Sequence, residues 1–237
     1  MNLAEKIDRS KSSDKINFAA IDCQQLDEPL VRLVTSDRLI VEPIWLNPND
    51  MEGQLYAAYI AEHPEYDGIY IRPEALKRLR HAADSLSHRY KIIVRAGHRP
   101  AEVQMSLLNN VMQDFKASHP AASDEEALAH ARLYVSDPAI KLPPHCCGAA
   151  LDIDLLDTHT GSLVDFGSPV NQDSEISHLH SELITPEQKA NRLMLLTAML
   201  DAGFASYYAE WWHYSYGDQI WAWFYGQETC LYGLAEV

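Results

Sequence analysis

The chain has 237 residues, 47% of them apolar and 22% charged, which excludes a disordered composition and is enough for a substantial core. Nineteen Lys and Arg stand against thirty-four Asp and Glu. The resulting net charge of −15 argues against nucleic acid as a partner, because the surface repels phosphate. No run approaches the ~20 apolar residues of a membrane-spanning helix, and the charges within residues 1–16 argue against a signal peptide. We therefore expect no membrane partner and a cytoplasmic location.

The first hundred residues combine short apolar runs with one helical pattern. Residues 1–15, rich in Lys, Asp and Ser, are expected to form a loose arm. Apolar and β-branched side chains predict strands over residues 31–34, 39–45, 68–71 and 91–95. Between the last two strands, apolar residues recur at helical spacing over residues 73–87, so a helix should lead into the strand at 91–95.

Three further helices are predicted by the same spacing, over residues 100–115, 124–134 and 185–200. The last of them has the clearest boundaries. Thr185 and Gln188 form a capping-box pattern, Pro186 suits the first helical position, and Gly203 follows the end.

Two later segments predict strands. Residues 149–155 alternate, with Leu151 and Ile153 on one face and Asp152 and Asp154 on the other, so the second face should line something polar. Residues 204–216 are rich in aromatic side chains and predict a strand, or a strand followed by a turn. Helices and strands in irregular order, without an internal repeat, predict a single α+β domain over residues 1–237.

The four cysteines form neither a disulfide framework nor a zinc-ribbon pattern. Cys146 and Cys147 are adjacent, and no two cysteines have the C-x-x-C spacing. We therefore expect reduced thiols, with Cys146 and Cys147 as packing residues.

The first segment that suggests a chemical role is PPHCCGAALDIDL, which contains His145. Asp152 follows seven residues later, and an odd separation would place the two side chains on opposite faces of a straight strand. A bend near Gly148 is therefore needed if both are to bind one ion, and the small residues there suit such a bend. The alternative is an ordinary turn into a strand whose aspartates face water; this segment alone does not decide between them.

The second signature is Glu210-Trp-Trp-His213. Residues three apart meet on one face of a helix or turn but lie on opposite faces of an ideal strand, so the chain must bulge if both serve one site. Taken alone, the segment fits a core strand with a partly exposed Glu and His better than it fits a metal site.

Together the two segments supply two imidazole nitrogens and one carboxylate. This set, His145, Asp152 and His213, is common for zinc and leaves a fourth position for water. Glu210, as a carboxylate that does not bind the metal, is suited to accept a proton from that water. The sequence therefore predicts one catalytic Zn²⁺ with Glu210 as general base.

Arg99 lies just after a predicted strand and just before a predicted helix, where loops often carry functional side chains. Its guanidinium could stabilise the oxyanion that develops on a scissile carbonyl. Arg95 and His98 are rival candidates, and a surface salt bridge is the alternative explanation for either arginine.

These motifs resemble those of the D-alanyl-D-alanine metallopeptidases. His145, Gly148, Ala150 and Asp152 match the pattern H-x-x-G-x-A-x-D, and Glu210, Trp212 and His213 match E-x-W-H. The Arg99-Pro100 pair resembles an element that precedes the metal motif in that family. Within that family, the chain is most similar to the dipeptidases of the vancomycin-resistance type. The similarity lies in the EWWH motif, the D-T-x-T-G-x-L-V segment at 157–164 and the Ser177-His178 pair. The similarity extends over about residues 39–216.

The resemblance implies a central antiparallel sheet flanked by helices, one catalytic Zn²⁺ and hydrolysis of a small D-amino-acid dipeptide. It also implies that His145, Asp152 and His213 are the ligands, Glu210 the general acid and base, and Arg99 the carbonyl stabiliser. Two features depart from the family: Pro143 stands where a serine is frequent, and residues 167–175 lack the expected aspartates. The alternatives are a D,D-carboxypeptidase acting on longer peptidoglycan stems and a zinc-binding module without catalysis.

Overall fold

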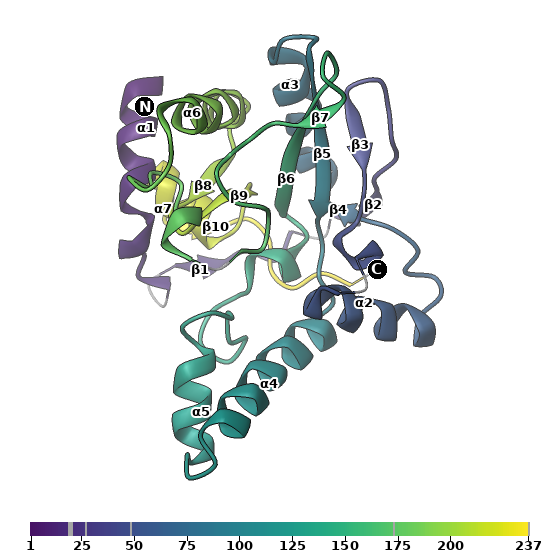
Figure 1. The fold of residues 1–237 in the computed structure, drawn as a ribbon, viewed down its shortest axis with the longest axis vertical. Helices are drawn as coiled ribbons and strands as arrows, with labels where there is room; N and C mark the ends of the chain where they lie inside the picture. The colour runs from purple at the N-terminus through teal and green to yellow at the C-terminus, as the bar shows by residue number, and fades with distance from the viewer. Residues whose placement is uncertain (19–20, 27, 48, 173, 237) are drawn as a thin grey trace.

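A computed structural model describes residues 1–18, 21–26, 28–47, 49–172 and 174–236 (Figure 1). Within these residues a six-stranded sheet has the order β3 (Leu39–Val41), β5 (Tyr90–Ala96), β6 (Ala150–Asp157), β9 (Glu210–Ser215) and β8 (Ala205–Tyr207), and β7 (Ser162–Leu163) pairs with β6. Strands β3 and β5 are parallel, whereas the other neighbouring pairs in this sheet are antiparallel. The predicted α+β fold with a mainly antiparallel central sheet is therefore confirmed.

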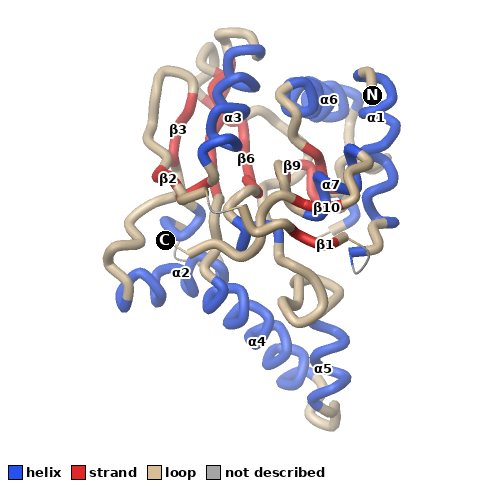
Figure 2. The backbone as a smooth tube through the Cα atoms, turned by 180° about the vertical axis from the view of Figure 1, so that it is seen from behind, coloured by secondary structure: helices blue, strands red, loops and turns tan. Residues whose placement is uncertain are grey.

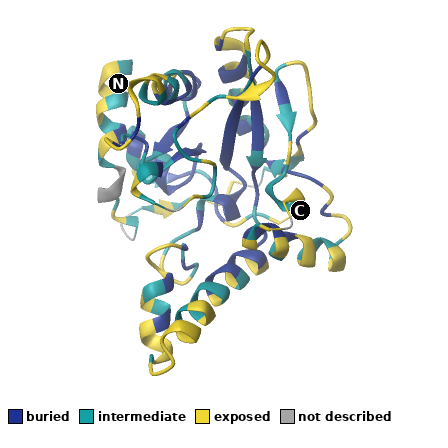
Figure 3. Ribbon diagram, in the orientation of Figure 1, coloured by how far each residue is buried: buried dark blue, intermediate teal, exposed yellow. Residues whose placement is uncertain are grey.

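Helices cover the apolar face of this sheet. Helix α3 (Pro73–Ser85) lies across it in Figure 2, and α6 (Pro186–Asp201) packs against α3. Leu151, Ile153 and Leu155 of β6 are completely buried in the same core as these helices, as predicted from the alternation. The central strands are accordingly buried in Figure 3, so the carboxylates on the opposite face of β6 have a rigid support.

Helices α4 (Ala101–Ser118) and α5 (Asp124–Ala131) form an arm that projects from the body of the molecule (Figure 1). Leu107, Leu108 and Ala131 form a small core of their own between the two helices. Both helices were predicted from their apolar spacing, although α5 ends at Ala131, before the predicted limit. The base of the arm lies beside the polar face of β6, where it contributes to the candidate site.

Several other elements differ from the predictions. Residues 39–45 do not form one strand: β3 ends at Val41 and a 3-10 helix, η3 (Ile44–Leu46), follows Pro43, which has no N–H to continue the ladder. Helices α2 (Met51–Glu62) and α7 (Gln219–Tyr225) were not predicted. The short strands β2 (Val31–Arg32) and β4 (Tyr70–Ile71) fall within predicted strands and pair with each other.

The N-terminal segment is a correction to the predicted loose arm. Residues Leu3–Arg9 form helix α1, whose start is fixed by a capping box between Asn2 and Glu5, and the 3-10 helix η1 (Ser10–Lys15) follows. Helix α1 packs against α6, and Lys6 donates to the carbonyl of Leu200 at 2.7 Å. The charged residues therefore lie on a docked helix.

The prediction that all four thiols are reduced is wrong. Strand β1 (Asp22–Cys23) pairs in parallel with β10 (Thr229–Cys230), and a disulfide joins Cys23 to Cys230. Cys146 and Cys147 are free and buried, as expected for packing residues. Among the described helices, none combines the length and apolar character needed to cross a membrane.

Candidate metal centre

A bend in the chain brings His145 over the polar face of β6. The 3-10 helix η4 (Pro144–Cys147) ends at Gly148, whose φ of 71° lies in the left-handed region that favours glycine. A Cβ at this position would lie 2.3 Å from a methyl carbon of Leu30, so a larger residue would also require the Leu30 side chain to move. The bend predicted near Gly148 is confirmed, and His145 and Asp152 lie on the same side of the sheet.

The register of β6 and β9 places Asp152 directly opposite His213. Side chains of directly opposed residues on neighbouring antiparallel strands point to the same face and lie within contact distance. His213 Nδ1 accordingly lies 3.1 Å from Asp152 Oδ1. The bulge required near Glu210 is also present, because the pairing of β8 with β9 shifts between Ser206 and Tyr207. It allows Glu210 Oε2 to lie 3.7 Å from His213 Nδ1.

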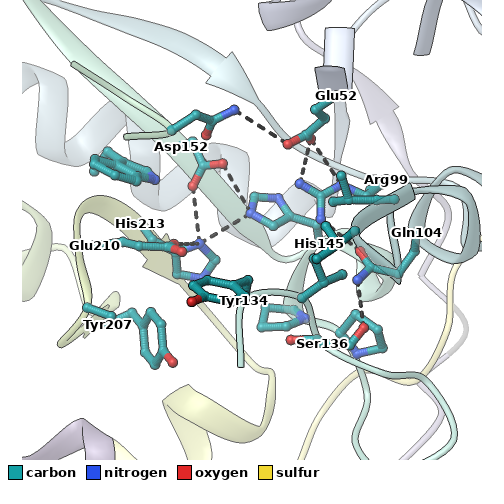
Figure 4. Close-up of a pocket in the computed structure, with 18 of the residues that line it drawn as sticks. Glu52, Arg99, Gln104, Tyr134, Ser136, His145, Asp152, Tyr207, Glu210 and His213 are labelled. Carbon is teal, nitrogen blue, oxygen red and sulfur yellow. Dashed lines mark hydrogen bonds and ion pairs between the residues drawn. The ribbon is translucent and has the colours of Figure 1, made fainter. Parts of the chain in front are cut away.

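Three donor atoms converge at this point (Figure 4). His145 Nε2 lies 3.3 Å from Asp152 Oδ2 and 3.2 Å from His213 Nδ1. His145 Nδ1 is 2.8 Å from the carbonyl oxygen of Gly97, which accepts a hydrogen bond from Nδ1–H in the tautomer whose Nε2 keeps its lone pair for a metal. Two metal bonds of ~2.0–2.1 Å at a tetrahedral angle place their donors about 3.3 Å apart. The observed spacings therefore fit a tetrahedral ion such as zinc.

The electrostatics of this cluster agree with a cation site. Asp152 is buried, which opposes its ionisation, but His145 and His213 lower its pKa well below the usual range. Cys146, next to the first histidine, does not belong to the donor cluster, and burial raises the pKa of its thiol to about 11. It therefore stays protonated near neutral pH and does not compete for the metal.

Glu210 lies beside the donor cluster without belonging to it. Removal of its carboxylate from bulk water raises its pKa, while His213 acts in the opposite direction. About a third of the side chain, 37%, is exposed, so the carboxylate is accessible from the pocket. A carboxylate next to the metal donors, with its proton affinity raised, has the properties of a general base.

Of the two candidate arginines, Arg99 and Arg95, Arg99 lines this pocket. Its Nε donates to Glu52 Oε1 at 3.0 Å and its Nη1 to Gln104 Oε1 at 2.7 Å. Burial disfavours its charge, but Glu52 raises its pKa, so the guanidinium remains charged. The two rivals serve other partners: Arg95 pairs with Glu42 at 2.7 Å, and His98 Nε2 lies 3.0 Å from the carbonyl oxygen of Ala235.

The pocket containing these groups has a volume of about 530 Å³, within the usual range for small-molecule sites. Its lining includes all five predicted residues, together with residues that the sequence did not indicate. Glu52 holds Arg99 and also accepts from Asn171 Nδ2 at 3.4 Å. Lys141 enters from the loop before η4. Asn171 belongs to the stretch that departs from the family; Asp173 in that stretch lies outside the described residues.

A buried His-Asp-His donor set beside an accessible carboxylate, inside a pocket, defines the class of metal-dependent hydrolases. A family model of the M15 peptidases, described as D-ala-D-ala dipeptidase, matches residues 71–230 and thus spans all five predicted site residues. The chain belongs to this family. The sequence-based identification of the chain as a metallopeptidase enzyme is thereby confirmed.

Individual relatives agree with this assignment. The chain is 29% identical over 241 residues to a D-alanyl-D-alanine dipeptidase of Synechocystis sp., covering 89% of this chain and 90% of that one. A D-alanyl-D-alanine dipeptidase of Enterococcus faecium is 37% identical over 75 residues, covering 32% and 37%. Among solved structures, VanYB in complex with D-alanine-D-alanine is 20% identical and covers 69% of this chain and 81% of that chain, with a TM-score of 0.41. A TM-score this low does not establish a shared fold.

Proposed function

We propose that this chain is a zinc-dependent dipeptidase that hydrolyses D-alanyl-D-alanine or a closely related dipeptide. The observation that carries the proposal is the convergence of His145, Asp152 and His213 beside Glu210 in one pocket. Membership of the D-ala-D-ala dipeptidase family supports the substrate class. The relative from Synechocystis sp. bears the same name and is similar over nearly the whole of both chains.

In this proposal His145, Asp152 and His213 hold one Zn²⁺. The donor spacings of 3.1–3.3 Å fit that ion, and the hydrogen bond of His145 Nδ1 to Gly97 orients the first ligand. Zinc in such a site supplies a Lewis acid and lowers the pKa of a bound water.

The remaining chemistry belongs to protein side chains. Glu210 takes the proton of the attacking water and later transfers it to the nitrogen of the leaving D-alanine. Arg99, fixed by Glu52 and Gln104, has further N–H groups that can donate to the scissile carbonyl oxygen as negative charge develops there. Because Arg99 is already held in place, its donors need little reorganisation when the peptide bond is attacked.

The test compares two substrates of the zinc-loaded protein, free D-Ala-D-Ala and a peptidoglycan stem pentapeptide that ends in the same dipeptide. We expect release of D-alanine from the free dipeptide and at least about tenfold lower kcat/KM for the pentapeptide. Turnover of the pentapeptide alone would establish the carboxypeptidase alternative instead. Zinc binding without turnover of either substrate would leave a non-catalytic zinc module.

A further inference from the structure

The pocket contains three cationic side chains besides the metal donors, and their partners differ. Arg99 is bound by Glu52 and Gln104, and Arg132 donates through Nε to Asp137 Oδ2 at 2.8 Å. Lys141 has no hydrogen-bond acceptor and no ion pair among the side chains that the structure describes. Its Nζ lies over the ring of Phe18, 4.5 Å from the ring centre. Lys141 is therefore the pocket cation for which the described residues provide no direct hydrogen-bond acceptor.

An ammonium group in this position needs acceptors. Lysine has three N–H donors, and an aromatic ring attracts the charge but does not replace three oxygen acceptors. Burial lowers the pKa of the Lys141 amine, while the field of Glu210 acts in the opposite direction. An anionic group in the pocket would supply the missing acceptors and favour the charged form.

Two of the lining residues that follow Lys141 in the chain offer no backbone donor to an anion. Pro143 and Pro144 line the same pocket and have no backbone N–H. Phe18 contributes its ring, and its carbonyl oxygen accepts from Gln219 Nε2 at 3.1 Å, which fixes this wall to α7.

The opposite side of the pocket carries carboxylates, and one of them, Glu52, is paired with Arg99. Asp50 and Glu52 enter from α2, and Asn171 lies against Glu52. Figure 1 shows α2 and α7 on different sides of β6, and Lys141 lies against Phe18, whose carbonyl oxygen accepts from Gln219 of α7. A dipeptide carries an ammonium at one end and a carboxylate at the other, which matches this arrangement.

We propose that Lys141 binds the C-terminal carboxylate of the dipeptide substrate. This proposal rests on the proposed function and adds a direction: the amino end of the substrate lies toward α2, and the departing D-alanine lies toward Lys141. Lys141 thereby selects a substrate with a free carboxylate in the residue after the cleaved bond.

The test compares D-Ala-D-Ala with its C-terminal amide, using zinc-loaded parent, Lys141→Met and Lys141→Arg. In Lys141→Met we expect KM for the free acid to rise about 10- to 100-fold, the range for a lost hydrogen bond to a charged group. The kcat/KM for the amide should change less than about twofold, since the amide offers no anion to lose. Lys141→Arg should retain the preference for the acid. Lys77→Met is the matched control, because Lys77 is 79% exposed on α3.

Binding without turnover gives a second readout. Calorimetry on zinc-loaded Glu210→Gln should detect binding of the free-acid dipeptide. In the double variant Glu210→Gln, Lys141→Met, that binding should be weaker by a factor similar to the rise in KM. Equal losses for acid and amide, or no change for the acid, would overturn the role of Lys141 while parental turnover still supports the dipeptidase. A parent that neither cleaves nor binds the acid would contradict the proposed function, and the Lys141 proposal with it.

Discussion

His213 is the residue on which the two halves of the site depend. Its Nδ1 faces Asp152 at 3.1 Å, His145 Nε2 at 3.2 Å and Glu210 at 3.7 Å. It therefore links the ligand pair supplied by the H-x-x-G-x-A-x-D segment to the carboxylate supplied by the EWWH segment. This position is the basis for our proposal that His213 is the third metal ligand.

The first prediction concerns this ligand. His213→Ala should lose zinc, because two remaining donors do not complete a zinc site. The matched control is His178→Ala, since His178 contacts Tyr208 in a tilted arrangement with the ring centres 4.9 Å apart and does not belong to the donor cluster. Metal analysis after dialysis measures the zinc content of both. One zinc per chain in His213→Ala would remove this residue from the ligand set.

The sequence predicted the residues of the metal cluster better than the residues around them. His145, Asp152, Glu210 and His213 stand in two short motifs whose spacing reflects the chemistry, and they meet in one pocket. Lys141 and Glu52 could not be found in this way, because neither belongs to a motif. Only the tertiary fold places Lys141 against Phe18 and Glu52 against Arg99.

At the scale of elements, the bend at Gly148 determines whether the first motif can work. Gly148→Ala should strain the left-handed backbone and press a Cβ against Leu30. We expect a loss of stability of about 2–4 kcal/mol and weaker zinc binding, since η4 carries His145. Gly161 is the matched control, because it has the same φ of 71° and nothing within 4 Å of an added Cβ.

Urea unfolding and zinc titration distinguish the two glycines. Gly161→Ala should cost only the backbone penalty, about 1–2 kcal/mol, and leave zinc affinity unchanged. If the two variants lost equal stability and bound zinc equally well, the close approach at Gly148 would have no role in positioning His145.

Elements with a clear period were predicted, and those that depend on tertiary packing were not. The capping box and proline at the start of α6 are local signals, and Thr185 caps this helix as expected. Helix α2 was missed because Gly53 in its first turn disfavours a helix. Glycine is nonetheless required there, since a Cβ would lie 2.8 Å from the carbonyl oxygen of Asn47. Helix α7 is dominated by aromatic and apolar residues that favour strands equally well.

At the scale of the whole molecule, a disulfide connects the two ends of the chain. Cys23 and Cys230 are separated by 207 residues, and their pairing follows from the β1–β10 contact, which no sequence spacing indicates. Such bridges persist in oxidising compartments and are rare in the cytosol. The cytoplasmic location stays a prediction. Whether the bridge between Cys23 and Cys230 is oxidised in the protein bears directly on that prediction.

Thiol counting tests the bridge. In protein denatured without reductant we expect two reactive thiols, Cys146 and Cys147, and four after reduction. The double variant Cys23→Ser, Cys230→Ser should be less stable by about 2–4 kcal/mol, because the unfolded chain regains the freedom that the cross-link removes. Four thiols without reductant would mean that the bridge does not form in the isolated protein.

The central claim is that Glu210 activates water at a zinc site built by His145, Asp152 and His213. The most direct measurement is turnover of D-Ala-D-Ala by Glu210→Gln, with zinc content determined on the same sample. Loss of the general base should lower kcat by about 10²- to 10⁴-fold, while one zinc per chain is retained because Glu210 is outside the donor cluster. Activity close to that of the parent in the zinc-loaded variant would contradict the account.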